Sequence, residues 1–237
     1  LQGRFANFIV LQGNQLVGAT LVVEDEEGNE YEINFEARDQ TQRYWEDGDD
    51  GTLLESWLLT SNPVLYPTRK LRICPIATQS SDPLFSAPAY HALIFRGDRY
   101  DAVSGEVIAT GEDAGPWFNV ACAGDVLSKL LIIRHAEAAQ DAGHQTSLGQ
   151  RTAAMKMFSA DYCGTGPNTE LGIQLDWANV GGWNYLDKMP SIANIEAIWN
   201  AGGAVCVNNP RLIPYEDMPC VLPKCETMKS WQDVGDL

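Results

Sequence analysis

The chain has 237 residues, of which 45% are hydrophobic and 20% charged, and its seven tryptophans and eight tyrosines argue against disorder. Sixteen Lys and Arg against 32 Asp and Glu give a net charge of −16, which repels nucleic acid and anionic membrane surfaces. The apolar run at residues 130–133 is far too short to cross a membrane. We therefore expect neither nucleic-acid binding nor membrane insertion.

Six cysteines stand in the sequence without any Cys-x-x-Cys pair, which suits neither zinc nor thioredoxin-like chemistry. An even number of widely spaced cysteines is typical of disulfides outside the cytosol, so we expect three disulfides, no metal, no cofactor, and a secreted or cell-surface location. Spacing favours one of the fifteen pairings that six cysteines admit: Cys74 with Cys122, Cys163 with Cys206, and Cys220 with Cys225. The chain begins at Leu1 without a methionine, so we expect any signal or anchor segment to lie outside the printed sequence.

The N-terminus has a five-residue rhythm, with a small or apolar residue at positions 1, 6, 11, 16 and 21. This rhythm resembles the coils of pentapeptide-repeat solenoids, in which apolar side chains at that spacing point to the axis. The alternative is an ordinary β-hairpin with glycine turns, because so few coils can barely bury a core of their own.

The rest of the first half is predicted to be β-rich. Strands are expected at residues 20–23 and 31–35, which form a hairpin around an acidic turn, and further strands at 53–59, 70–76 and 91–100. An acidic loop lies at residues 45–52 between the second and third of these strands. Its carboxylates, Asp47, Asp49 and Asp50, are calcium candidates, but the loop lacks the helix-loop-helix calcium spacing and the alternative is a solvated turn.

The second half is predicted to contain helices. After a strand at 117–122, Asp125 is a suitable N-cap for a helix over 126–139. A second helix is expected to begin at Thr146 or Ser147, to run to about Tyr162 and to stop at Gly164. A strand at 204–207 follows. The fold class predicted is α+β, with a β-rich N-terminal half, two adjacent helices near 125–163 and a disulfide-reinforced C-terminal part.

The second half contains several distinctive motifs: Phe118-x-x-x-Cys122-x-Gly124, Lys129, the block Ala160-Asp161-Tyr162-Cys163-Gly164, and Glu196-Ala197-x-Trp199 leading into Gly203-Ala204-Val205-Cys206. Together these motifs resemble those of the ADYC-domain proteins, which are extracytoplasmic bacterial proteins associated especially with myxobacteria. The resemblance covers roughly residues 70–225. It implies secretion, a disulfide-bonded domain and no assigned enzymatic activity. We expect an N-terminal region at 1–65 and an ADYC-like domain at 66–237, or one continuous fold.

Two positions depart from the family pattern, since Leu130 and Ala154 stand where further cysteines would be expected. Both are replaced together, which is the pattern expected if the pair forms a bridge between the two helices. In this chain apolar packing is expected to take the place of that bridge, and an even number of cysteines is left.

Three functional alternatives compete with a purely structural interpretation. Cys163 could be the nucleophile of a thiol enzyme, with His135 or His144 as base and Asp161 as the orienting carboxylate, although the end of a helix disfavours a thiolate. Asp161 or Glu196 could serve an acid/base hydrolase. Exposed aromatic side chains, Trp177, Trp183 and Tyr185, could line a carbohydrate or peptide groove. The tripeptide Arg96-Gly97-Asp98 matches an adhesion motif, but three residues occur too often by chance to carry weight.

The structural interpretation is favoured for the block at residues 160–164, which we call the signature block. Asp161 is expected to accept hydrogen bonds from the Gly-Thr-Gly loop that follows it, and Tyr162 to pack between helix and sheet. We therefore expect a secreted or cell-surface binding or structural domain without assigned catalysis, with self-assembly as one form. Its expected partners are a second copy of the chain or an extracellular protein or glycan. The alternative is an extracytoplasmic hydrolase or thiol enzyme that uses Cys163 and Asp161 with a histidine.

Overall fold

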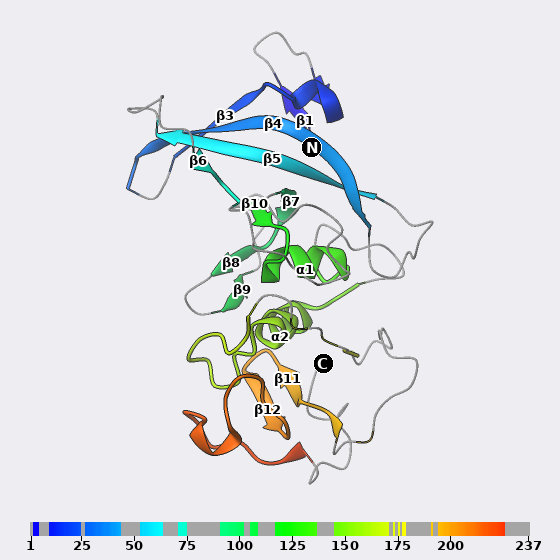
Figure 1. The fold of residues 1–237 in the computed structure, drawn as a ribbon, viewed down its shortest axis with the longest axis vertical. Helices are drawn as coiled ribbons and strands as arrows, with labels where there is room; N and C mark the ends of the chain where they lie inside the picture. Colours follow the sequence, from blue (N-terminus) through cyan, green and yellow to red (C-terminus); the bar gives the residue numbers. More distant parts are fainter. Residues whose placement is uncertain are drawn as a thin grey trace. The chain divides into compact units, whose positions relative to one another are not determined.

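The computed structural model describes most of the chain in separate stretches. They are residues 2–4, 10–24, 27–43, 53–63, 71–74, 91–101, 105–108, 117–136, 145–170, 173, 175, 177–178, 191 and 194–225. The chain forms two compact units, unit 1 from Leu1–Arg96 with Phe118–Ile132, and unit 2 from Gly97–Trp117 with Ile133–Leu237 (Figure 1). The boundary expected between residues 65 and 66 falls outside the described residues and stays a prediction.

Unit 1 is built on an antiparallel sheet that has six strands among the described residues, in the order β10-β7-β5-β4-β3, with β6 paired to β5. The strands are β3 (Thr20–Glu24), β4 (Glu30–Arg43), β5 (Leu53–Pro63), β6 (Leu71–Arg72), β7 (Ala92–Gly97) and β10 (Trp117–Cys122). Figure 1 shows β4 and β5 as the long neighbouring strands of this sheet. The β-rich first half predicted from the sequence is present.

The hairpin of β3 and β4 follows the predicted alternation, because Leu21 pairs with Ile33 and these residues share a face with Phe35. β4 continues well past the predicted end at Phe35. It does so through two irregularities in its pairing with β5, between Phe35 and Ala37 and between Asp39 and Gln42. Each irregularity shifts the alternation of faces, so a strict two-residue pattern cannot follow the strand that far.

The core of unit 1 lies on one face of this sheet. Phe35 and Trp57 meet edge to face with ring centroids 5.2 Å apart, and Leu16 from a 3₁₀ turn, η1 (Gly13–Leu16), joins them. The disulfide Cys74–Cys122 closes the core from the side of β10. Burial of these large side chains is the main source of stability of the unit.

The N-terminal residues form an antiparallel pair, β1 (Gln2–Arg4) with β2 (Val10–Gln12), in which Gln2 lies opposite Gln12. This is the hairpin alternative. Pentapeptide coils are not confirmed, although Leu16, one residue of the five-residue rhythm, is buried in the core.

Unit 2 contains two short antiparallel strand pairs and a helix among its described residues. The pairs are β8 (Arg99–Asp101) with β9 (Glu106–Ile108) and β11 (Ala197–Asn200) with β12 (Gly203–Val207); the helix is α2 (Leu148–Ser159), and a 3₁₀ turn, η5 (Tyr215–Asp217), follows later. α2 packs against β9, β11 and β12. A turn at residues 201–202 joins β11 to β12, and the strand expected at 204–207 is present as β12.

The two helices differ in length from their predictions. α1 (Val126–Ile132) ends well before residue 139, because Arg134 has a φ of +57°, in the left-handed region that ends a helix. α2 begins as predicted at Ser147, whose hydroxyl accepts a bond from the Gln150 N–H while the Gln150 side chain accepts from Ser147. It ends at Ser159 rather than near Tyr162.

Among the described residues the structure has no helix that is both long enough and apolar enough to cross a membrane.

Candidate functional site

The signature block lies directly after the last turn of α2. Ala160 takes a left-handed conformation, with a φ of +52°, and its N–H and that of Asp161 donate to the carbonyls of Met157 and Lys156 at 3.1 and 2.9 Å. This is a helix C-cap of the kind that glycine usually supplies. The chain therefore turns sharply at Ala160, and the next three side chains point into different surroundings.

Asp161 is buried and both of its carboxylate oxygens are engaged. Oδ1 accepts the Gly166 N–H at 3.0 Å, and Oδ2 forms an ion pair with the Lys156 ammonium at 3.7 Å, with side-chain exposures of 8% and 5%. The predicted bond from the loop after the block is confirmed. A carboxylate held on both sides in this way orders the loop, and it is not presented to a substrate.

Tyr162 joins the block to the β11–β12 pair. Its ring is 2% exposed and stacks on Trp199 of β11 with centroids 5.1 Å apart, as the prediction of packing between helix and sheet requires. Its hydroxyl donates to Glu196 Oε1 at 2.5 Å and accepts the Arg211 N–H at 2.6 Å. Burial, and then the bond to the Glu196 carboxylate, raise the pKa of the phenol well above its usual value near 10.

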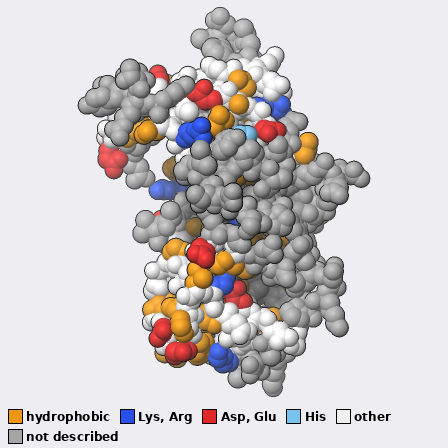
Figure 2. Space-filling model, in the orientation of Figure 1, with side chains coloured by type: hydrophobic (Ala, Val, Ile, Leu, Met, Phe, Trp, Pro, Cys, Tyr) orange, Lys and Arg blue, Asp and Glu red, His pale blue; other side chains and the backbone are white. Residues whose placement is uncertain are grey.

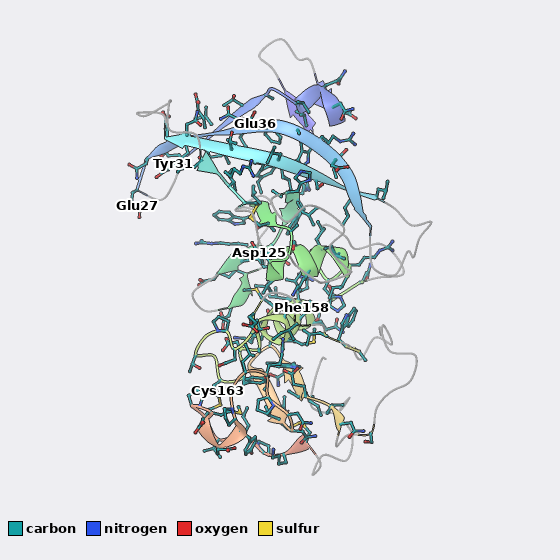
Figure 3. The ribbon with its side chains drawn as sticks, viewed as in Figure 1. Glu27, Tyr31, Glu36, Asp125, Phe158 and Cys163 are labelled. Carbon is teal, nitrogen blue, oxygen red and sulfur yellow. A yellow bond between two sulfur atoms is a disulfide. The ribbon has the colours of Figure 1, made fainter. Side chains whose placement is uncertain are left out.

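Arg211 completes this network from the segment after β12. Its Nε donates to Glu196 Oε1 at 2.8 Å, and its terminal nitrogens donate to the carbonyls of Met157 and Phe158 in the last turn of α2. A cation is stabilised there by the negative end of the helix dipole. Figure 3 shows Phe158 on α2 and Cys163 on the segment that follows, and Arg211 ties these regions to β11. Sequence reasoning named Glu196 but missed Arg211, which stands in no motif.

The six cysteines are all paired, which confirms the expected three disulfides. The pairing Cys74–Cys122 is as predicted, but two predicted pairs are wrong: Cys163 bonds Cys220, and Cys206 bonds Cys225. The physical reason lies in residues 220–225, which do not close a small ring. This segment runs along β12, where Pro223 C=O accepts the Val207 N–H at 3.0 Å and Asn208 Oδ1 accepts the Cys225 N–H at 2.8 Å.

The family model that describes the ADYC domain matches residues 13–213. The chain belongs to the ADYC domain family. The match includes most of the described part of unit 1 and of unit 2, and it begins earlier than the resemblance at residues 70–225 indicated. Neither the curated proteins nor the solved structures give a match.

Within this ADYC domain the proposed thiol-enzyme residues do not form a nucleophile and base. Cys163 carries a disulfide, so it has no thiol to ionise. His135 is fully buried, with Nδ1 3.0 Å from the Ile133 carbonyl oxygen and its ring edge-on to Trp177. Burial lowers the pKa of His135 to about 4, which leaves the ring neutral at ordinary pH. His144 lies outside the described residues.

The aspartate of the adhesion-like tripeptide at residues 96–98 forms a second buried ion pair. Asp98 is 1% exposed and its Oδ2 accepts from Arg151 Nε at 2.6 Å, while Arg151 also donates to the Thr146 carbonyl at 2.6 Å. The Asp98 side chain is thus part of the interior of unit 2. It does not present a carboxylate to an external receptor.

The remaining candidates divide between buried and undescribed residues. Trp177 is 6% exposed and packs on His135, so the prediction that it lines an open groove is wrong for this residue. The described residues contain no group of three His, Cys, Asp or Glu able to hold a metal. The other named candidates lie outside the described residues: Trp183, Tyr185, Asp47, Asp49 and Asp50.

The two positions that depart from the family's cysteine pattern are both apolar interior positions. Leu130 on α1 and Ala154 on α2 each have an exposed fraction of 0%. Each is therefore an interior position of its own unit, and the expected packing of the two against each other stays a prediction.

Proposed function

We propose that this ADYC domain is a secreted or cell-surface α+β domain whose role is binding or structural and not catalytic. One observation carries the proposal: every side chain of the signature that has reactive chemistry is engaged in a contact that holds the fold. Cys163 is in a disulfide, Asp161 holds Gly166 and Lys156, and Tyr162 holds Glu196 and Arg211.

The chemistry of these contacts argues against the enzyme alternatives. A thiol enzyme needs a thiolate, and a general acid or base needs a group that can exchange a proton near the working pH. The pKa of Tyr162 is raised, away from the range in which a phenol could act as a base at neutral pH. Glu196, the other hydrolase candidate, shares one oxygen between Tyr162 and Arg211.

The disulfides support a location outside the cytosol. Cys163–Cys220 and Cys74–Cys122 close long stretches of chain, with sequence separations of 57 and 48, and closing loops of that length stabilises a domain by about 4 kcal/mol each. The third bridge, Cys206–Cys225, lies in a small cluster with Ile198 and is fully buried. Such bridges persist in oxidising compartments and resist the unfolding that exposes a chain to extracellular proteases.

The experiment compares the same chain produced in two compartments. One sample is exported to a bacterial periplasm behind a cleavable leader, and the other is kept in a reducing cytosol. We expect the exported protein to carry three disulfides and to resist trypsin, and the reduced protein to be digested quickly because it unfolds more often. Equal resistance of the two samples would contradict the proposed dependence on an oxidising location.

Binding and self-assembly are the two forms that the proposed role covers, with a second copy or an extracellular protein or glycan as partner. Sedimentation over a range of concentrations separates them. A mass that grows with concentration supports assembly. A constant monomer mass leaves binding of another molecule as the form to test.

A further inference from the structure

The outer edge of β3 is a place where the sheet of unit 1 can accept another strand. β3 is the last strand in the sheet order, and among the described residues it pairs only with β4. The Phe35 N–H donates to the Ala19 carbonyl at 3.0 Å, and this bond fixes the alternation along the pair. Leu21 and Val23 therefore bond to β4, whereas the N–H and C=O groups of Thr20 and Val22 point away from it.

The side chains of this edge are exposed at alternate positions. Thr20, Val22 and Glu24 are exposed, and 57% of Val22 is accessible, whereas Leu21 and Val23 between them are half-buried. An exposed β-branched residue in the middle of an edge strand offers an apolar contact to an incoming strand.

Charge identifies the kind of strand that fits. Residues 5–37 contain no Lys, Arg or His, and residues 24–36 contain seven Asp and Glu. Two cross-strand pairs share one face of the sheet: Glu24 of β3 lies opposite Glu30 of β4, and Val22 lies opposite Glu32. We call the three glutamates of these two pairs, Glu24, Glu30 and Glu32, the acidic rows. Figure 3 labels Glu27 at the turn of the hairpin and Glu36 farther along β4, and Figure 2 shows acidic side chains near that turn.

An interior acceptor in one of these rows also lacks a donor. Asn62 of β5 lies opposite Glu32, is 7% exposed, and donates through Nδ2 to Glu32 Oε2 at 3.4 Å. Its Oδ1 has no hydrogen-bond donor within the described residues. A buried acceptor without a donor is unfavourable by about 1–3 kcal/mol. Asn62 lies on β5, roughly 14 Å from a strand added beside β3, so the cations of such a strand are expected to reach the glutamates nearer the edge and not this amide oxygen.

A second copy of this chain is a poor occupant of the edge. Pairing two β3 edges would bring two sets of acidic rows together in a chain whose net charge is −16, and acidic side chains on an edge oppose such pairing. An incoming strand with Lys or Arg at alternate positions removes this repulsion and places its cations over the carboxylates. The backbone bonds then supply affinity and the charges supply selectivity.

We propose that the edge of β3 binds an extended Lys- or Arg-rich segment of a partner protein as an added strand beside Thr20, Val22 and Glu24. This inference rests on the proposed binding role. It adds to that role the site, the mode of binding and the chemistry of the partner.

The test uses the whole disulfide-bonded chain and a fluorescent peptide of about ten residues in which Lys alternates with Val, a length typical of a strand. A second peptide of equal charge, in which Lys alternates with Pro, lacks half of the backbone donors. Fluorescence anisotropy at two salt concentrations measures both affinities. The same protein sample is treated with iodoacetamide under native conditions, and the labelling of Cys163 is measured by mass spectrometry.

Two variants probe the backbone and the charge separately. Val22→Pro removes an N–H that points away from β4, and proline is tolerated at such an edge position. The triple variant Glu24→Lys, Glu30→Lys and Glu32→Lys reverses the acidic rows. Its matched control changes three exposed glutamates of unit 2 by the same charge: Glu106→Lys, Glu170→Lys and Glu216→Lys.

We expect the Lys–Val peptide to bind the wild-type chain, with affinity falling as salt rises, and to bind Val22→Pro and the reversed variant about tenfold more weakly or worse. The control triple variant should bind within about threefold of wild type, because the substituted glutamates belong to unit 2 and not to the sheet that carries the edge. Equal affinity for the Lys–Pro peptide, or an unaffected Val22→Pro variant, would overturn strand addition. A wild-type dimer that Val22→Pro dissociates would overturn the choice of occupant.

The labelling of Cys163 distinguishes a failure of this docking site from a failure of the proposed non-catalytic role. If the peptide does not bind and Cys163 stays unlabelled, the docking site is wrong while the non-catalytic role stands. If Cys163 is labelled in the native protein, the proposed role itself fails.

Discussion

Arg211 is the residue whose loss should damage the signature network most. Its side chain is 9% exposed, forms an ion pair with Glu196 at 2.8 Å, and reaches the carbonyls of Met157 and Phe158 at the end of α2. The substitution Arg211→Ala removes all of these contacts at once. It leaves the Glu196 carboxylate with the Tyr162 hydroxyl alone among the partners described above.

The expected magnitude follows from the burial of the pair. Breaking a buried ion pair by removing one partner destabilises a protein by about 3–5 kcal/mol, and the Glu196 side chain keeps 23% exposure, which places this pair at the lower end. We therefore expect Arg211→Ala to lower the free energy of unfolding by about 3 kcal/mol. Arg211→Lys keeps the charge but loses the planar fork, so its loss should be smaller, about 1–2 kcal/mol.

Urea denaturation followed by far-UV circular dichroism measures these losses. Arg96→Ala, at an exposed arginine on β7, is the control and should change stability by less than about 0.5 kcal/mol. A double-mutant cycle with Glu196→Gln should give a coupling of about 1–3 kcal/mol. A loss below about 1 kcal/mol for Arg211→Ala, or no coupling to Glu196, would refute the view that this network holds α2 to β11.

Three further predictions concern ionisation and the disulfides. Because the pKa of Tyr162 is raised in the folded chain, its stabilising contribution is complete below pH 10 and is lost as the pH rises above that value. Above pH 10 the free energy of unfolding should therefore fall more steeply with pH for wild type than for Tyr162→Phe. Parallel pH dependences of the two proteins would contradict this. Burial lowers the pKa of His135 from 6.5 to about 4. The contribution of the neutral His135 ring to the free energy of unfolding should therefore be complete above pH 6.5 and be lost as the pH drops from 6.5 toward 4. In His135→Gln the free energy of unfolding should fall less steeply between pH 6.5 and pH 4 than in wild type. An unchanged slope in the variant would exclude His135 as the cause of the fall. Replacing Cys163 and Cys220 together by Ala should remove about 4 kcal/mol, and replacing Cys206 and Cys225 about 3 kcal/mol, because their sequence separations are 57 and 19. Unchanged urea midpoints for both pairs would show that the bridges do not stabilise the fold.

Local pattern predicted the elements whose residues follow one rule throughout. Apolar and polar residues alternate over residues 31–35, which pair with residues 20–24 in the β3–β4 hairpin. Ser147 and Gln150 have the spacing of a capping box, and α2 begins there. The pattern failed where a residue other than glycine takes a left-handed conformation. Arg134 and Ala160 end their helices at φ values of +57° and +52°, and neither residue type signals such a stop.

The site was predictable only in its local parts. The bond from the loop to Asp161 spans five residues, and the sequence indicated it because aspartate before a glycine loop makes such turns. Arg211 lies 49 residues from Tyr162, and nothing in its neighbourhood marks it as the partner of Glu196. The disulfide pairing failed for the same reason, because the path of residues 220–225 along β12 is a tertiary feature.

Mapping the disulfides of the native protein tests the central claim most directly. Digestion without reduction, followed by mass spectrometry, should yield one linked peptide pair that contains Cys163 and Cys220 and another that contains Cys206 and Cys225. That result would support a signature block committed to holding the fold. A native protein in which Cys163 is unpaired would contradict the account and would make a reactive thiol beside Asp161 and Tyr162 the feature to explain.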